Sequence, residues 1–221
     1  MKSAKSFAAL KCSQYKNVNE LIATIDDQLH PVETLYGDLQ AELLVLGQDS
    51  MHWDGFAALY KVHNRGAYCH GDNRTNQAIT SALSDYLKKT SIRRGMPSSP
   101  KDCGVFYGNA IWLLKDTATM SGPLRNLQQA KKACRPVFTA TLDGLPCLKV
   151  IWAMGKVSYE FLREVDTGNS LLAEWDSAKT MLQYGNFGGR HLAVFTTEHG
   201  SRARTDIVTR VHDRLRESCL M

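Results

Sequence analysis

Three polar side chains follow or interrupt apolar stretches of the sequence, and their types suit the cleavage of a glycosidic bond. They are Asp49, Asn109 and His199. A carboxylate can position water and stabilise a cationic sugar, while a histidine can stabilise a departing anion. An asparagine amide can read a donor and an acceptor on one edge of a base. Brought together in a cleft, these groups would meet the needs of removing a nucleobase from deoxyribose.

Four apolar runs of strand length must position these side chains. They cover residues 43–46, 105–112, 150–154 and 192–196. Continuous apolar runs are typical of buried parallel strands, and helical patterns alternate with them. We therefore expect an α/β fold: a single three-layer domain with a central four-stranded, mainly parallel sheet flanked by helices. Right-handed crossovers would place all the strand ends, where open sheets bind ligands, on one edge.

Amphipathic stripes and turn residues predict the remaining elements. No linker splits the chain, so we expect one domain over 1–221, with an N-terminal helical part at 1–40 and the sheet core at 41–217. Gly185–Gly189 reads as a turn. The expected helices cover residues 17–29, 31–39, 75–90, 121–134, 137–145, 171–182 and 207–215, with a further helix following Gly155.

Composition narrows the class of protein. The 221 residues are 43% hydrophobic and 22% charged, which excludes a disordered or fibrous chain, and the net charge of +5 suits a polyanion without requiring one. The six cysteines are widely spaced, so neither a zinc site nor an iron–sulfur cluster is expected. Neither a signal peptide nor a membrane-length apolar run occurs. We expect an intracellular protein, cytoplasmic or in the nucleoid if bacterial, without contact to a membrane.

Residues 50–73 form a stretch without clear periodicity that is rich in aromatic side chains. A long loop inside a compact domain is usually functional. Its aromatic residues could stack on a planar ligand, or they could cover the edge of the sheet, and the sequence leaves both readings open. The candidates for stacking are Trp53, Phe56, Tyr60 and Tyr68.

The order of four motifs resembles the uracil-DNA glycosylase superfamily. Leu43–Asp49, an apolar strand running into Gly-Gln-Asp, looks like its first motif. Val105–Ala110 is similar to the strand that carries the base-reading asparagine, and Leu148–Tyr159 looks like the third strand with its following helix. Phe195–Arg202 is placed like the second catalytic motif, His-Pro-Ser. The resemblance spans residues 43 to about 215 and depends on the order of short motifs.

The resemblance implies a role for each matching residue at the base. Asp49 would position the water or stabilise the sugar cation, and His199 would stabilise the anionic leaving base. Asn109 would hydrogen-bond the flipped base, with the backbone of Gln48 near a base carbonyl and Tyr60 or Tyr68 among the candidates to stack on it. The reaction would need no metal and no cofactor.

The resemblance also implies contacts to DNA. Ser201 would contact a phosphate, and Arg202 or Arg204 would enter the minor groove at the position that the base has left. Flipping a base costs a few kcal/mol, which phosphate contacts in a basic groove offset. The expected partner is DNA carrying uracil or a related damaged base, bound by a monomer.

Two departures from the family pattern concern specificity and the histidine loop. Ser50 and Met51 replace the Pro-Tyr that follows Gly-Gln-Asp in the best-known branch, where the aromatic side chain excludes thymine. Gly200 replaces the proline of His-Pro-Ser. These departures keep two alternatives open: a non-catalytic DNA- or nucleotide-binding protein on the same fold, and a hydrolase of small nucleosides.

Overall fold

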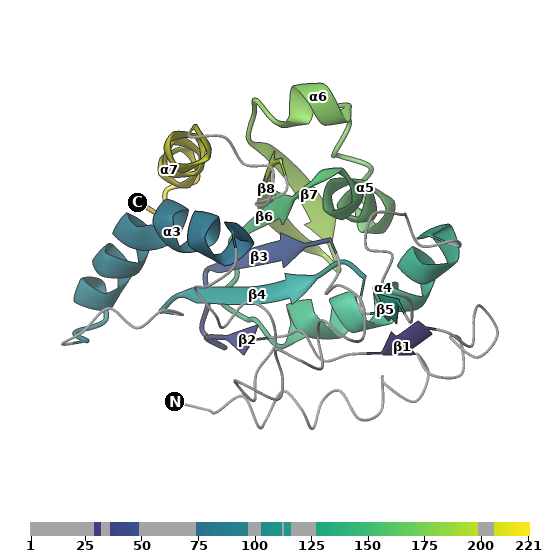
Figure 1. Ribbon diagram of the computed structural model, residues 1–221, viewed down its shortest axis with the longest axis horizontal. Coiled ribbons are helices and arrows are strands. Elements are labelled where there is room, and N and C mark those ends of the chain that lie inside the picture. The colour runs from purple at the N-terminus through teal and green to yellow at the C-terminus, as the bar shows by residue number, and fades with distance from the viewer. Residues whose placement is uncertain are drawn as a thin grey trace.

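The computed structural model describes residues 29–31, 36–48, 74–96, 103–111, 113–115, 127–198 and 206–221. These residues form an α/β fold around a six-stranded sheet in the order β2-β4-β3-β6-β8-β7 (Figure 1). Helices cover both faces of the sheet, so the molecule has three layers. The predicted α/β class and mainly parallel sheet are confirmed.

The four apolar runs form the four central strands, and all of their neighbouring pairs are parallel. Every residue of the first three strands is buried, because helices cover both faces, and this explains their uninterrupted apolar sequences. The strands are β3 (Leu43–Gly47), β4 (Val105–Asn109), β6 (Val150–Met154) and β8 (Arg190–Thr197).

Two short antiparallel strands extend the sheet beyond the four that the sequence predicts. β2 (Tyr36–Gly37) pairs with β4, and β7 (Gln183–Phe187) pairs with β8. The expectation of a turn over residues 185–189 is wrong for its first part, because Gly185–Phe187 belong to β7. The hairpin turn is made by Gly188 and Gly189, which have φ values of 60° and 80° that favour glycine.

A buried carboxylate closes the outer edge of β7. Asp166 accepts the backbone N–H groups of Gly168, Ser170 and Leu171 at 3.1, 2.5 and 2.8 Å, and that of Asn186 in β7 at 2.8 Å. Burial by itself raises the pKa of Asp166, but these backbone donors outweigh it and the pKa is lowered. The loop after α5 (Lys156–Val165) is thereby fixed to the sheet.

A separate two-stranded ladder joins β1 (Leu29–Pro31) to β5 (Leu113–Lys115) in antiparallel pairing. The helix expected over residues 31–39 is therefore wrong, since Pro31 lies in β1 and Tyr36–Gly37 form β2. The helix expected over residues 17–29 lies outside the described residues, apart from Leu29.

Two helices pack side by side on one face of the sheet (Figure 1). They are α3 (Arg74–Arg93) and α7 (Ile207–Glu217), as the amphipathic stripes predict. Their apolar side chains pack on those residues of each strand that point to this face, and the cluster includes Val45, Tyr107, Trp152 and Phe195. The rings of Trp152 and Phe195 stack with centroids 5.9 Å apart.

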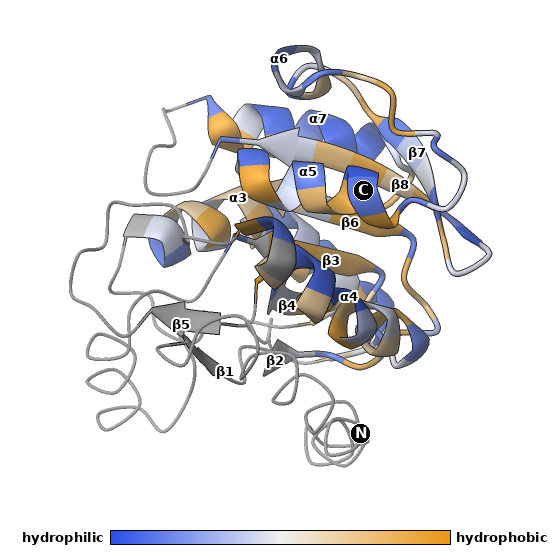
Figure 2. Cartoon of the chain, turned by 90° about the vertical axis from the view of Figure 1, so that its right-hand side faces the viewer, coloured by the Kyte–Doolittle hydropathy of each residue, from blue (hydrophilic) through white to orange (hydrophobic). Residues whose placement is uncertain are grey.

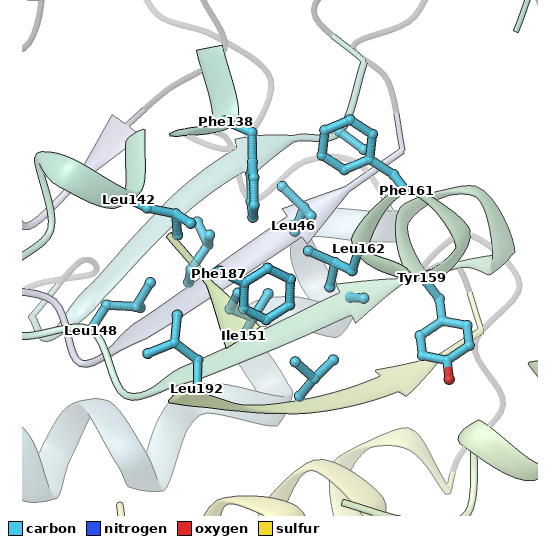
Figure 3. Close-up of a cluster of buried hydrophobic side chains, with 14 of the residues drawn as sticks. Leu46, Phe138, Leu142, Leu148, Ile151, Tyr159, Phe161, Leu162, Phe187 and Leu192 are labelled. Atoms are coloured by element: carbon cyan, nitrogen blue, oxygen red, sulfur yellow. The ribbon is translucent and has the colours of Figure 1, made fainter. Parts of the chain in front are cut away.

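The opposite face carries α4 (Leu127–Asp143) and α5 (Lys156–Val165). Figure 3 shows the cluster beneath them, with Leu46, Ile151 and Leu192 from the strands meeting Phe138 and Phe161 from the helices. The rings of Phe138 and Phe161 meet edge to face at 5.3 Å. In Figure 2, which colours the chain by hydropathy, hydrophobic residues are concentrated on the strands and on parts of the helices, with hydrophilic residues on other parts of the helices.

Two helix predictions on this side are wrong. The sequence predicts separate helices before and after Pro136, but α4 runs through Pro136 without a break. An internal proline costs about 3 kcal/mol, and here the burial of Val137, Phe138 and Leu142 on the apolar stripe offsets that cost. Between residues 171 and 182 only α6 (Trp175–Ala178) is helical.

In the part of the chain that the structure describes, no helix has both the length and the apolar character needed to cross a membrane.

Candidate functional site

The carboxyl edge of the sheet brings two of the predicted site residues together. Gly47 at the end of β3 lies in register with Asn109 at the end of β4. Beyond this pair, the Ala110 N–H donates to the Gly47 carbonyl at 2.8 Å and the Ile111 N–H to the Gln48 carbonyl at 2.9 Å. The Gly-Gln step and Asn109 are therefore held on neighbouring strands by continuous backbone hydrogen bonds.

The same edge contains the switch point of the fold. The connection that follows β3 leads to α3 on one face, whereas β6 leads through Gly155 to α5 on the other face. The pairing of β3 with β6 ends at Leu46 and Ala153, one residue earlier than the pairing of β3 with β4. Open α/β sheets bind ligands at such a switch point, where the connections that follow two neighbouring strands lead to opposite faces of the sheet.

Asn109 is only 3% exposed although it stands at a strand end. Side chains two residues apart in a strand lie on the same face of the sheet. Val105 and Tyr107 pack under α3 and α7, so the amide of Asn109 lies on that face as well. A buried amide has donors and acceptors with fixed directions. Such a group is suited to reading the edge of a planar ligand.

The end of β8 is fastened to β6 at this edge. The Gly155 N–H donates to the Thr197 carbonyl at 2.8 Å, and the Thr196 hydroxyl donates to the Ala153 carbonyl at 2.7 Å. On the other face the Trp152 indole Nε1 donates to the Thr197 hydroxyl at 2.9 Å. Thr197 in turn donates to the Glu198 carbonyl at 3.1 Å. The chain therefore leaves β8 from a rigid position.

A lysine on the α6 side approaches the same strand end. The ammonium of Lys179 lies 4.0 Å from the Glu198 carboxylate, 2.9 Å from that of Asp176 and 5.5 Å from the centre of the Trp175 ring. The Lys179 side chain is 20% exposed while Glu198 is 41% exposed. The Glu198 carboxylate thus borders the edge, partly in solvent and next to a positive charge.

Seven predicted site residues lie outside the described part of the chain. Of the predicted set, the described structure contains Gln48 and Asn109 and brings both to one edge. The seven others are Asp49, Tyr60, Tyr68, His199, Ser201, Arg202 and Arg204. Asp49 is joined in sequence to Gln48, and His199 to Glu198, so both follow described residues at the carboxyl edge.

Charged residues also line a hollow of about 360 Å³ between α4 and α5. The Lys131 ammonium, which is 1% exposed, lies 2.8 Å from Glu164 and 3.5 Å from Glu160. Arg135 joins the cluster with a distance of 3.1 Å to Glu164. Since each charge has a partner of opposite sign, this cluster is best explained as the polar contact that holds the two helices together.

A larger hollow of about 520 Å³ lies at the amino edge of the sheet. It contains Glu42, which is paired with Arg93 and lies 2.6 Å from the Lys149 ammonium. Burial by itself raises the pKa of Glu42, but Lys149 and Arg93 outweigh it, and the pKa is lowered. Arg94 is likewise paired with Asp38. These ion pairs connect β2, β3 and α3, so we interpret them as contacts that stabilise the fold.

The structure adds Trp152 and Thr197 to the site, neither of which the motifs indicate as functional. The sequence indicates only that a buried indole N–H needs an acceptor. That Thr197 is this acceptor follows from the pairing of β6 with β8. Within the described ranges, no three His, Cys, Asp or Glu side chains are grouped as a metal ion would require.

The site is thus defined by polar residues at the carboxyl ends of β3, β4 and β8, around the switch point of an α/β sheet. β3 and β8 are two strand spacings apart, which is about 10 Å. No protein-family model matches the chain, and neither does any curated protein.

Proposed function

We propose that this protein is a DNA glycosylase that hydrolyses the N-glycosidic bond of uracil or a related damaged base flipped out of DNA. One observation carries the proposal: Gly47 and Asn109 are in register on neighbouring parallel strands. The Gly-Gln-Asp motif and the candidate base-reading amide therefore leave the sheet at the same edge. β8 ends at that edge with Thr197, and His199 is the second residue after it in the sequence.

The proposed reaction breaks the bond between the base nitrogen and C1′ of the sugar. Asp49 stabilises the positive charge on the sugar and positions the water whose oxygen bonds to C1′. His199 stabilises the negative charge on the leaving base, which takes up a proton as the free base. The products are an abasic site and the base, and no electrons are transferred.

Recognition of the base would come from Asn109 and the Gln48 peptide. The Asn109 side chain is an amide with both donor and acceptor atoms, the combination that the edge of a uracil ring also presents. The Gln48 carbonyl accepts the Ile111 N–H, which fixes the Gln48 backbone at the edge where the proposal places a base carbonyl. The basic net charge of +5 favours binding to the phosphate backbone.

The test is a base-release assay on end-labelled oligonucleotides, single- and double-stranded, that each contain one uracil or another deaminated base. We expect alkali-labile strand breaks at the lesion and free base in solution, with an unmodified strand left intact. Asp49→Asn and His199→Ala should each lower the turnover by about 100-fold or more while DNA affinity is kept.

Three other outcomes would contradict the proposal in different ways. Salt-dependent DNA binding with intact oligonucleotides across the whole panel would favour a non-catalytic DNA-binding protein. Release of base from free nucleosides but not from DNA would favour a nucleoside hydrolase. Loss of DNA binding in Asp49→Asn, with unchanged turnover on bound DNA, would assign Asp49 a structural role.

A further inference from the structure

We propose that the C-terminal end of α3 carries a surface that binds the phosphate backbone of DNA away from the flipped base; this inference rests on DNA being the partner in the proposed function. The surface consists of Lys88, Lys89, Arg93 and Lys149, and we name it the α3 basic surface. Both α3 lysines are exposed, and the side chains of Arg93 and Lys149 are 50% and 59% exposed. Contacts from such side chains to phosphates position nucleic acid without reading its sequence.

The cations of this surface outnumber the carboxylates around them. Arg93 and Lys149 share a single carboxylate, that of Glu42. Neither α3 lysine forms an ion pair with any described residue. Asp85, which lies one turn before the lysines, has its carboxylate 3.9 Å from Nδ1 of His212. Four cations thus face two carboxylates, and the excess positive charge can bind an anion.

The helix itself explains only part of this charge. The dipole of a helix favours basic residues in its last turn, and Arg93 occupies that turn in α3. Lys88 and Lys89 lie one turn earlier, where the effect of the dipole has become small. Between residues 77 and 84 the exposed positions of α3 carry only Gln, Thr or Ser. The exposed lysines are therefore concentrated at one end of the helix for a reason other than the dipole.

An exposed isoleucine lies among these cations. Ile92 is 69% exposed and follows Lys88 by four residues, so the two side chains are neighbours on the surface of the helix. Binding of a helix in a membrane surface requires a broad apolar face. Among the described side chains of α3, Ile92 is the only large apolar one that is exposed. The charge therefore determines the partner, and it favours DNA over a lipid surface.

The α3 basic surface is remote from the edge where base release is proposed. Arg93 pairs with Glu42, which precedes β3, whereas Gly47 ends β3 at the carboxyl edge. The five residues from Glu42 to Gly47 span about 16 Å of strand. A phosphate bound at the α3 basic surface is thus about five base pairs from the flipped base, at about 3.4 Å per pair. The surface should affect how tightly DNA binds and not how fast the glycosidic bond breaks.

The test uses the double variant Lys88→Gln/Lys89→Gln and a long undamaged duplex. Each lost phosphate contact lowers the salt dependence of binding, so raising the salt from about 50 to about 200 mM should weaken wild-type binding about tenfold more than binding of the variant. Glutamine retains the helix propensity of lysine, and both side chains are exposed, so the fold is kept. On a long duplex with one uracil, the variant should have a raised KM and the wild-type kcat.

Lys132→Gln/Arg135→Gln is the matched control, because it removes the same charge from exposed positions of α4 on the opposite face of the sheet. This variant should keep the wild-type salt dependence. An equal decrease in both double variants would show that only the net charge matters and would overturn the inference. Binding to phosphatidylserine vesicles that requires Lys88 and Lys89, with DNA binding unchanged in their absence, would overturn it in favour of a membrane.

The inference and the proposed function can fail separately. DNA binding that loses its salt dependence in Lys88→Gln/Lys89→Gln, without base release by the wild type, would refute the glycosylase and support the surface. Base release with the same KM and the same salt dependence in wild type and variant would refute the surface alone.

Discussion

The two edges of the sheet use polar side chains differently. At the amino edge the described groups are charged and neutralise one another: Glu42 with Arg93 and Lys149, and Asp38 with Arg94. At the carboxyl edge the buried polar side chains of the described residues include the uncharged Asn109, Thr196 and Thr197. The charged pairs at the amino edge therefore connect elements of the fold. At the carboxyl edge, amide and hydroxyl groups are kept in fixed directions.

This comparison predicts that a change at the carboxyl edge affects the reaction far more than the stability. Asn109→Ala removes the buried amide and should lower kcat for base release by about 100-fold per folded molecule, since loss of one well-placed polar group costs that much in enzymes. The measurement is single-turnover base release with the folded fraction determined by circular dichroism.

The control for this variant is Asn186→Ala. The Asn186 side-chain oxygen is buried and has no hydrogen-bond partner among the described residues, so its removal should leave both activity and stability nearly unchanged. Equal losses of activity in the two variants would break the proposed distinction between the edges.

At the amino edge we predict the reverse pattern. Glu42→Gln should lower the free energy of unfolding by about 1–2 kcal/mol at pH 7 and leave activity per folded molecule unchanged. Because the folded pKa of Glu42 is lowered, its stabilisation is present above the unfolded pKa, near 4.3, and is lost as the pH falls through the folded pKa. Urea unfolding at pH 7 and at several values below 4.5 measures both effects.

Glu174→Gln is the matched control for this prediction. Glu174 also pairs with an arginine, Arg163, at 3.3 Å, but its side chain is 83% exposed. An exposed pair contributes little, so the change in stability should be small. A difference between wild type and Glu42→Gln that stays constant down to pH 2 would contradict the assigned role of Glu42.

The smallest expected effect concerns Tyr86, whose hydroxyl donates to the Gly104 carbonyl at 3.0 Å. Burial, followed by the nearby Glu42 charge, raises the pKa of Tyr86 to about 12. Since the neutral form is favoured in the folded state, its stabilisation is present below pH 10 and is lost as the pH rises towards 12. Tyr86→Phe should cost about 1 kcal/mol at pH 7 and flatten this alkaline decline.

The half-exposed Tyr184 gives the comparison for this variant. Tyr184→Phe should cost little stability at pH 7, because 47% of the residue is in contact with solvent. Urea unfolding at pH 7, 9 and 11 separates the two cases. An alkaline decline of the same slope in Tyr86→Phe and wild type would contradict the prediction.

The sequence was sufficient for the central strands because burial on both faces requires continuous apolar runs, as in Leu43–Gly47 and Val150–Met154. It was misleading for β7, whose Gln-Tyr-Gly-Asn-Phe sequence contains the turn-forming residues Gly185 and Asn186. Pairing with β8 and the contact of Asn186 with Asp166 make this segment a strand. The hairpin pairing with β8 is local, but the contact of Asn186 with Asp166 joins residues 20 positions apart and leaves no local pattern.

For the candidate site, the motifs predicted that Gln48 and Asn109 share an edge, and the register of β3 with β4 confirms it. The motifs could not indicate Thr197 or Trp152, because the bond between them depends on the pairing of β6 with β8. Hydrogen bonds of this kind follow from tertiary register, which the spacing of residues in one strand does not contain.

The carboxylate of Asp166 has a consequence for how copies of this protein behave towards one another. Outer sheet edges with unpaired N–H and C=O groups recruit further strands and start aggregation. Here the Asn186 N–H of the edge strand β7 donates to Asp166, and its carbonyl accepts the Thr167 N–H at 2.8 Å. Both backbone groups of Asn186 are thus used within the chain, and at this residue β7 offers no template for a strand from a second molecule.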